Sequence, residues 1–352
     1  MSINVKYYKS LDAFVRDCKD ENNRYLLLVA QECKFYMSLL KNSKIEAYGA
    51  IFPEIIFEAV SYKDGLLAYK LDDDEKIIMQ NDISKISFDK EQFKQTKSVI
   101  TFVDGLSHHI DEFLDSFFEL LEPQTQVLGG GAGMTPFNRK EVIFSPEGIY
   151  KDAALLLCKK QEINIGVEHG WTILKDQLVT TLVNETSILQ IDYNNALDYY
   201  KKVIEEDLNI QINDINDYLN SYPIGLVKFD NEILVKEIFD VSNDSLNISN
   251  SISQNSVIAI LKGNKDKLIN AAKQATLEAV GKCENKQSAV LVFECVSRKN
   301  FLKESFDDEM QIIKTTSDNR LMLGVLTLGE IVNKGDVNLN LFNKTCLVGA
   351  IC

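Results

Sequence analysis

The chain has 352 residues, of which 45% are apolar and 26% charged, and this globular balance and length suit about two domains or one large domain of repeated units. Its 38 Lys and Arg against 52 Asp and Glu give a formal net charge of −14, which disfavours nucleic acids and anionic lipid surfaces as partners. The N-terminus lacks a signal-peptide pattern, no run approaches the roughly 18 apolar residues of a membrane helix, and the seven cysteines include no Cys-x-x-Cys, so we expect a cytoplasmic protein in a reducing compartment.

One arrangement of predicted elements occurs three times along the chain. It begins with a buried strand, at 25–30, 99–103 and 289–296, and continues with a helix and a second strand that ends at a glycine corner. A hairpin follows each corner, and Asp64-Gly65 marks the first one, because glycine accepts positive φ. The helical crossovers favour parallel strands, and the hairpins add antiparallel ones. We therefore predict an α/β chain of mixed α+β character, whose repeated strand-helix-strand-hairpin modules form mixed sheets covered by helices.

A different pattern separates the second module from the third. It includes a segment rich in Ser and Asn at 243–255, which is typical of a surface loop with a short strand. The predicted elements are strands at 163–167 and 178–183, helices at 193–208 and 214–219, paired strands at 224–229 and 233–238, and a helix at 265–280. The boundary between two halves is expected around 160–175, which divides the chain into 1–165 and 166–352. Neither half contains a recognisable output domain.

The most conspicuous local motif is the glycine-rich run at 129–133. Glycines let a ligand approach the backbone N–H groups, which can form an anion-binding nest. A dinucleotide fingerprint is excluded, because Met134 stands where the third glycine is needed, and no Gly-Lys-Ser/Thr of a P-loop is present. A tight, crowded strand corner explains the run equally well. Gly130 and Gly131 are its candidate ligand contacts.

The only tryptophan, Trp171, follows His169 and Gly170. An indole suits the wall of a small-ligand pocket, but it suits an ordinary core as well. His169 is a candidate to titrate near neutral pH. The two other histidines, His108 and His109, are adjacent and point in different directions. No metal site and no cofactor are therefore predicted.

Cys295 ends a predicted buried strand, three residues before Arg298. A nearby guanidinium can depress the pKa of a thiol and make it a nucleophile, with His169 as a distant candidate base. The alternative is a buried cysteine that packs as a small apolar group. No Gly-x-Ser-x-Gly elbow of a serine hydrolase occurs. A cysteine-dependent enzyme acting on a small metabolite is therefore one possible function, and iodoacetamide labelling of Cys295 tests it.

Two polar motifs lie near the last glycine corner. Glu330 follows Gly329, and Asn343-Lys344-Thr345 forms the turn of the closing hairpin. A carboxylate for an ammonium group, together with glycine-corner N–H groups for a carboxylate, suits a zwitterionic ligand. The alternative is a solvated Glu330 beside an ordinary Asn turn.

Taken in order, these motifs resemble the FIST family of F-box and intracellular signal transduction proteins. The resemblance rests on the glycine run 129–133, Val142-Ile143-Phe144, Glu147-Gly148, Asp152-Ala153-Ala154, Gly170-Trp171, Val179-Thr180, Ala196 before an aromatic-containing helix, Cys295 to Arg298, Gly324 to Ile331 and Asn343 to Thr345. It implies a FIST N-terminal domain, a FIST C-terminal domain, an intracellular sensory role and small ligands such as amino acids. Thr172 departs from the pattern, because the family often has a Pro-x-Gly after Gly-Trp.

The resemblance favours a sensor that is not an enzyme and that signals through a separate partner protein, because the kinase, chemotaxis and cyclase modules that often adjoin FIST regions are not recognisable. Its pocket for an amino acid or small carboxylate is expected between the two halves, at the carboxyl ends of strands. The residues expected to line it are Gly130, Gly131, Trp171, Arg298, Glu330 and Asn343. Besides the cysteine enzyme, an acidic scaffold that recognises another protein is a further alternative.

Overall fold

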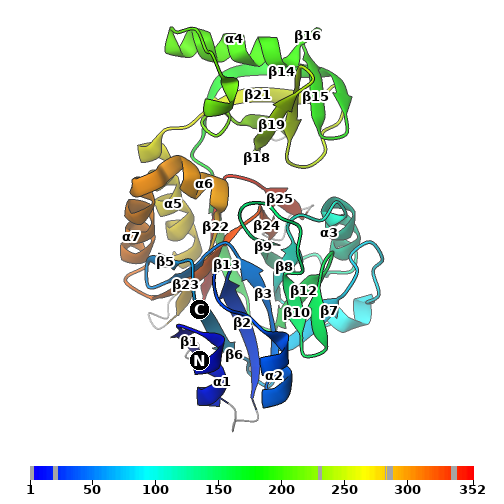
Figure 1. Cartoon of the computed structure of the whole chain (residues 1–352), viewed down its shortest axis with the longest axis vertical. Coiled ribbons are helices and arrows are strands. Elements are labelled where there is room, and N and C mark those ends of the chain that lie inside the picture. Colours follow the sequence, from blue (N-terminus) through cyan, green and yellow to red (C-terminus); the bar gives the residue numbers. More distant parts are fainter. Residues whose placement is uncertain (1–3, 19–22, 229–231, 282, 284–287, 334–338) are drawn as a thin grey trace.

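The computed structural model describes residues 4–18, 23–228, 232–281, 283, 288–333 and 339–352, and it contains two bodies. The larger body, here called the core, carries both termini and holds three six-stranded sheets (Figure 1). The smaller body, here called the inserted domain, is formed by residues 172–262 and lies at one end of the core. None of the helices in the described part of the chain combines the length and apolar character needed to cross a membrane.

Three units of the same element order build the core, as the sequence predicts. The first unit consists of β1 (Val5–Tyr8), α1 (Leu11–Cys18), β2 (Arg24–Ala30), α2 (Met37–Ser43), β3 (Glu46–Phe52), β4 (Ile55–Phe57), β5 (Val60–Tyr62) and β6 (Leu66–Lys70). The second unit consists of β7 (Lys76–Gln80), η1 (Lys90–Phe93), β8 (Ser98–Asp104), α3 (Ile110–Phe118), β9 (Gln126–Ala132), β10 (Ile143–Ser145), β11 (Gly148–Tyr150) and β12 (Ala154–Lys159).

The third unit contains the inserted domain between its first strand and its first helix. Its core elements are β13 (Ile163–Glu168), α5 (Lys265–Val280), β22 (Ala289–Cys295), α6 (Val296–Leu302), η3 (Lys303–Ser305), α7 (Phe306–Thr316), β23 (Leu321–Thr327), β24 (Glu330–Asn333), β25 (Asn340–Phe342) and β26 (Cys346–Ile351). The predicted mixed α/β fold of repeated modules is confirmed. The predicted division at 165/166 falls within β13 and stays a prediction.

The three units exchange hairpins in a closed cycle. Within each unit two strands pair in parallel, β2 with β3, β8 with β9 and β22 with β23. The outer edge of β3 then takes β10 from the second unit, β9 takes β24 from the third, and β23 takes β4 from the first. Each of the three core sheets thus needs strands from two units, so the three units form one core.

A glycine occupies the equivalent position in the second parallel strand of every unit. Gly49, Gly129 and Gly324 each lie beside the carbonyl of the neighbouring strand, and an added Cβ would come within 2.1, 1.8 and 2.0 Å of its oxygen. No other residue fits without parting the strands. Close strand packing therefore requires glycine at these three positions, two of which lie at corners predicted from the sequence; the third predicted corner is Gly329 and not Gly324.

Apolar side chains from the three parallel pairs meet on the central axis of the core. They surround a cavity of about 30 Å³, lined by Leu26, Leu28, Tyr69, Ile100, Phe102, Leu157, Lys159, Leu291, Phe293, Leu323, Gly324 and Ile351. The volume suits a water molecule and not a metabolite. The Lys159 ammonium pairs with the buried Glu75 carboxylate, and burial lowers the pKa of Lys159 to about 8.

The inserted domain is a strongly bent antiparallel sheet packed against one long helix. Its elements are β14 (Thr172–Asn184), β15 (Ser187–Ile191), β16 (Asn194–Asn195), α4 (Ala196–Leu208), η2 (Ile215–Asp217), β17 (Ile224–Val227), β18 (Ile233–Lys236), β19 (Ile238–Ser242), β20 (Ser245–Ile248) and β21 (Val257–Lys262). Asn195 caps α4 by accepting from the Asp198 N–H, and Tyr200 anchors it by donating to the Tyr222 carbonyl. The predicted helix at 214–219 is a single 3₁₀ turn, and the predicted strand end at 229 lies outside the described residues.

Candidate functional site

A group of buried and half-buried polar side chains lies where the inserted domain meets the core. The core contributes the ends of β22 and β23, the start of β24 and the turn between β25 and β26. We call this group the junction. Its members are Trp171, Cys295, Ser297, Thr327, Glu330, Asn343, Lys344 and Thr345 from the core, with Asn220, Glu237 and Asn250 from the inserted domain.

Glu330, a predicted site residue, is completely buried at the start of β24. Its Oε1 accepts from the Thr327 hydroxyl at 2.6 Å, and its Oε2 accepts from the Thr345 N–H at 3.2 Å. Burial raises the pKa of this carboxyl to about 8, although these hydrogen bonds favour the charged form. Glu330 is thus mostly protonated at neutral pH, and the idea of a solvated glutamate is wrong.

Replacing Glu330 by glutamine is expected to change how stability depends on pH. Between about pH 5 and pH 8 the folded protein holds a proton on Glu330 that the unfolded chain releases, so the free energy of unfolding falls as pH rises. Glu330→Gln removes this decline, and its stability relative to the parent should rise by a few kcal/mol across that window. Urea unfolding at half-unit pH steps measures this. If the free energies of unfolding of the parent and of Glu330→Gln change with pH in parallel, the raised pKa is refuted. Glu206→Gln, at an exposed position, is the control and should follow the parent.

Lys344 is the central cation of the junction, and its side chain is fully buried. Its ammonium contacts the side-chain oxygen of Asn220 and lies 3.3 Å from the Asn220 carbonyl and 3.5 Å from Glu237 Oε1. It also lies 5.3 Å from the centre of the Trp171 ring, a cation–π distance. Nearly all of its polar contacts therefore come from the inserted domain. The sequence indicates Lys344 only as part of a turn, and its position between two buried strands was the available signal.

Trp171 connects the entry to the inserted domain with the Lys344 turn. It is 4% exposed, its ring stacks at a tilt on Phe301, and its indole N–H donates to the Lys344 carbonyl at 2.9 Å. The tryptophan is thus both a core residue and one wall of the junction. Asn343 is buried beside it in the turn, and its amide donates to Asn250 Oδ1 at 3.4 Å.

Gly130 and Gly131 lie in β9 opposite the glycine turn before Glu330. Gly130 pairs with Glu330 across the sheet, and the Gly131 N–H donates to the Gly329 carbonyl at 2.9 Å. A Cβ on Gly131 would lie 2.5 Å from the Leu328 carbonyl oxygen. Here the small residues serve tight packing behind Glu330, and the N–H of Gly131 is already used within the protein.

Arg298 is fully buried behind the junction and holds several elements together. Its guanidinium donates to Glu309 at 2.6 and 2.9 Å and lies 3.0 Å from Glu294. It also donates to the carbonyls of His169 at 2.5 Å and Leu268 at 2.6 Å, and more distantly to that of Lys344. Arg298 therefore holds together the elements that carry the junction residues.

His169 is neutral in this arrangement. Burial and the adjacent Arg298 charge lower its pKa to about 4, and its Nδ1 accepts from the Trp171 N–H at 2.9 Å. The expectation that it titrates near neutral pH is wrong, because the sequence does not show the buried guanidinium beside it. In the part of the chain that the structure describes, no group of three or more His, Cys, Asp or Glu side chains is arranged to hold a metal ion.

Cys295 lies at the end of β22 with 2% of its surface exposed. Burial and the nearby Glu330 and Glu237 carboxyl groups raise its pKa well above the ordinary value. The Arg298 guanidinium that was expected to activate it is engaged by two glutamates. These are the properties of an unreactive thiol.

The junction occupies one of three equivalent corners of the core. The pairing registers of β6, β12 and β26 align Asp64, Asp152 and Lys344 as equivalent turn residues. The turn residue is therefore an aspartate at two corners and a lysine at the corner that the inserted domain covers.

A separate open groove of about 440 Å³ runs along the inserted domain, and it is lined by Leu174, Lys175, Tyr199, Lys202, Val203, Glu206 and Asp207.

Two family models match the chain, and together they cover residues from both bodies. The FIST N domain matches residues 41–194, and the FIST C domain matches residues 196–333. The two matches meet inside the inserted domain, next to the N-cap of α4. A search among curated protein sequences finds no significant match.

Proposed function

The chain belongs to the FIST family, whose domains are associated with signal transduction, and from this premise we propose that it is an intracellular sensor. It binds a small amino acid or another small carboxylate at the junction and signals through a separate partner protein. The observation that carries the proposal is the fully buried Lys344 ammonium, paired with the Glu237 carboxylate of the inserted domain.

A buried ammonium needs an anion, because leaving it unpaired costs several kcal/mol. Glu237 is the described carboxylate closest to Lys344, and it also accepts from the Ser297 hydroxyl at 2.6 Å. A ligand carboxylate can replace Glu237 at Lys344 and keep the ammonium paired. The displaced Glu237 is then available for a ligand ammonium group, which explains a preference for zwitterions.

The connections between the two bodies suit a response to such an exchange. Residues 172–262 join the core through Gly170, with a φ of +74°, and through Gly263. Asn220 and Asn250 of the inserted domain accept hydrogen bonds from the Lys344 turn across the boundary. Breaking the Lys344–Glu237 contact therefore alters how the inserted domain is held, and a partner protein reads that change.

Two substitutions with opposite expected results test this proposal. Ligand at a hundredfold excess over its Kd should stabilise the parent by about 2.7 kcal/mol in a thermal-shift screen of amino acids and small carboxylates. Lys344→Met should weaken binding of the best hit at least about 100-fold, a loss of roughly 2.7 kcal/mol. Glu237→Gln should tighten binding of a carboxylate that has no ammonium group, because the internal competitor loses its charge, and it should remove the preference for zwitterions. Calorimetric titration of each variant measures both changes.

The exposed Lys202→Met is the matched control, and it should bind like the parent. If Lys344→Met does not fold, the Glu237→Gln result still decides, because it preserves the size of the side chain. A flat response of the parent across the whole library contradicts the proposal. Equal affinities of the parent, Lys344→Met and Glu237→Gln contradict it too.

A further inference from the structure

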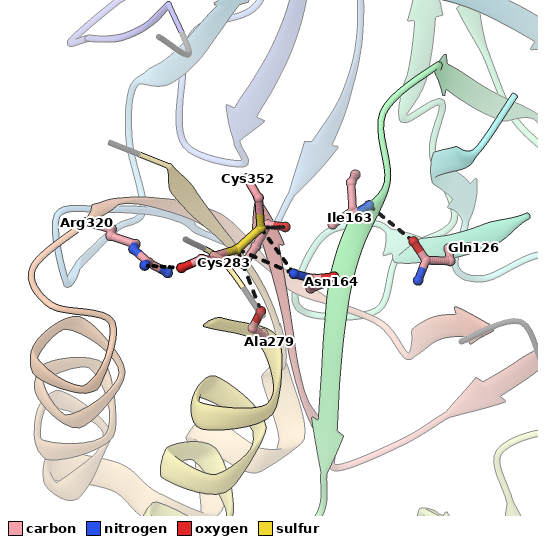
Figure 2. The surroundings of a disulfide bond; sticks show 8 residues. Gln126, Ile163, Asn164, Ala279, Cys283, Arg320 and Cys352 are labelled. Atoms are coloured by element: carbon pink, nitrogen blue, oxygen red, sulfur yellow. Dashed lines mark hydrogen bonds between the residues drawn. A yellow bond between two sulfur atoms is a disulfide. The ribbon is translucent and has the colours of Figure 1, made fainter. Parts of the chain in front are cut away.

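One pair of cysteines differs from all the others in the described chain. Cys283 and Cys352 form a disulfide that joins the region after α5 to the end of β26, across 69 residues of sequence (Figure 2). The cysteines at 18, 33, 158, 295 and 346 are free and buried. Cys352 is exposed and Cys283 is half-buried, so this pair alone is accessible to a dissolved thiol or disulfide.

Polar side chains from two other segments surround the pair. The Asn164 side-chain amide donates towards both sulfurs, at 3.1 Å to Cys352 and 3.5 Å to Cys283. Figure 2 shows this amide directed at the disulfide, with Arg320 on the other side of Cys283. The Arg320 guanidinium donates to the Cys283 carbonyl at 3.3 Å, and its Nε and Nη1 have no hydrogen-bond partner among the described residues.

The fold does not depend on this bond to bring its two ends together. β26 pairs with β13 and with β22 over its whole length, and α5 packs on both β13 and β26. The reduced protein thus retains the same arrangement, with α5 held by its noncovalent contacts. Oxidation adds a covalent clamp between the end of α5 and the last strand of the sheet.

We propose that Cys283 and Cys352 form a reversible dithiol–disulfide site, oxidised by low-molecular-weight disulfides. The Cys352 thiolate attacks one sulfur of the disulfide R–S–S–R, and the first R–S⁻ leaves. The Cys283 thiolate then attacks the Cys352 sulfur and releases the second R–S⁻. The two cysteine protons pass to the leaving thiolates, so two thiols are oxidised and one R–S–S–R becomes two R–SH. The site does not depend on the proposed ligand.

Thiol counting in glutathione redox buffers tests the site. The purified full chain is equilibrated at a series of ratios of reduced to oxidised glutathione, quenched with acid, unfolded, alkylated and weighed by mass spectrometry. We expect seven alkylated thiols under the most reducing conditions and five after oxidation, with a single reversible transition. Peptide mapping should assign the lost pair to Cys283 and Cys352. The oxidised form should melt about 4–8 °C higher than the reduced form.

Cys352→Ser and Cys283→Ser are the matched variants, and neither should show the loss of a thiol pair or the redox-dependent melting temperature. Three results would overturn the proposal. One is a pair that stays oxidised at every ratio, which is a permanent structural bond. The second is a pair that stays reduced at every ratio. The third is oxidation of the five buried thiols along the same transition.

Discussion

Replacing Arg298 by methionine is expected to lower the free energy of unfolding by about 3–5 kcal/mol. The substitution keeps an apolar stem but leaves Glu309 and Glu294 buried without their cation. It also removes the donors to the His169 and Leu268 carbonyls, which join the entry of the inserted domain to α5. Urea unfolding at pH 7, followed by Trp171 fluorescence and by circular dichroism, measures the loss.

A double-mutant cycle separates the ion pair from the general loss of packing. Glu309→Gln should lower the free energy of unfolding much less in the Arg298→Met background than in the parent, because the buried Glu309 carboxylate is then already unpaired. The exposed Lys202–Glu206 pair, in which both side chains are more than 60% exposed, supplies the control. Lys202→Met should change stability by less than about 0.5 kcal/mol. If Arg298→Met lowers the free energy of unfolding by less than about 1 kcal/mol, Arg298 does not hold the junction elements together as proposed.

The repeated module was predictable from the sequence because its parts leave local signals. Buried strands such as β2 and β22 appear as short apolar runs. The hairpins expected at Asp64-Gly65 and at Asn343-Lys344 are wrong, because β6 pairs with β1 and β2 rather than with β5, and β26 pairs with β13 and β22 rather than with β25. The cyclic exchange of hairpins leaves no such signal. The register that pairs Ile56 with Gly324 joins positions far apart in the sequence, and neither strand shows its partner in its own pattern.

The inserted domain was visible only as a change of pattern. The sequence indicated its helix and most of its strands, since α4 is strongly amphipathic and capped. Its position over one of three equivalent corners could not be predicted, because that position follows from where the chain leaves β13 and re-enters at α5. The same holds for the contacts of Asn220 and Glu237, which are polar residues in polar stretches.

The candidate site was predictable where unusual residues lie next to buried strands. Trp171, Glu330 and Asn343 lie together around the Lys344 turn, and their role as ligand contacts stays a prediction. Arg298 could be placed near Cys295 from their spacing, but its direction could not. Its side chain points to Glu309, a residue on α7 whose burial depends on helix packing.

Substituting alanine for any of the three equivalent core glycines should lower the free energy of unfolding by about 3 kcal/mol, the upper end of the usual cost of overpacking. At Gly49, Gly129 and Gly324 the new methyl group would lie about 2 Å from a carbonyl oxygen of the paired parallel strand. That oxygen belongs to the backbone, so it can move only if the two strands part. Thermal and urea unfolding of the three single variants measures the effect.

Gly148→Ala is the control for this comparison. Its added Cβ would meet nothing closer than the Tyr150 hydroxyl at 3.3 Å, so the variant should differ from the parent by less than about 0.5 kcal/mol. Similar losses at all three core positions follow from the cyclic exchange, because each glycine lies between its own parallel partner and a hairpin from the next unit. A large loss at one position with none at the other two would mean that the units are not equivalent in packing, and the threefold description of the core would fail.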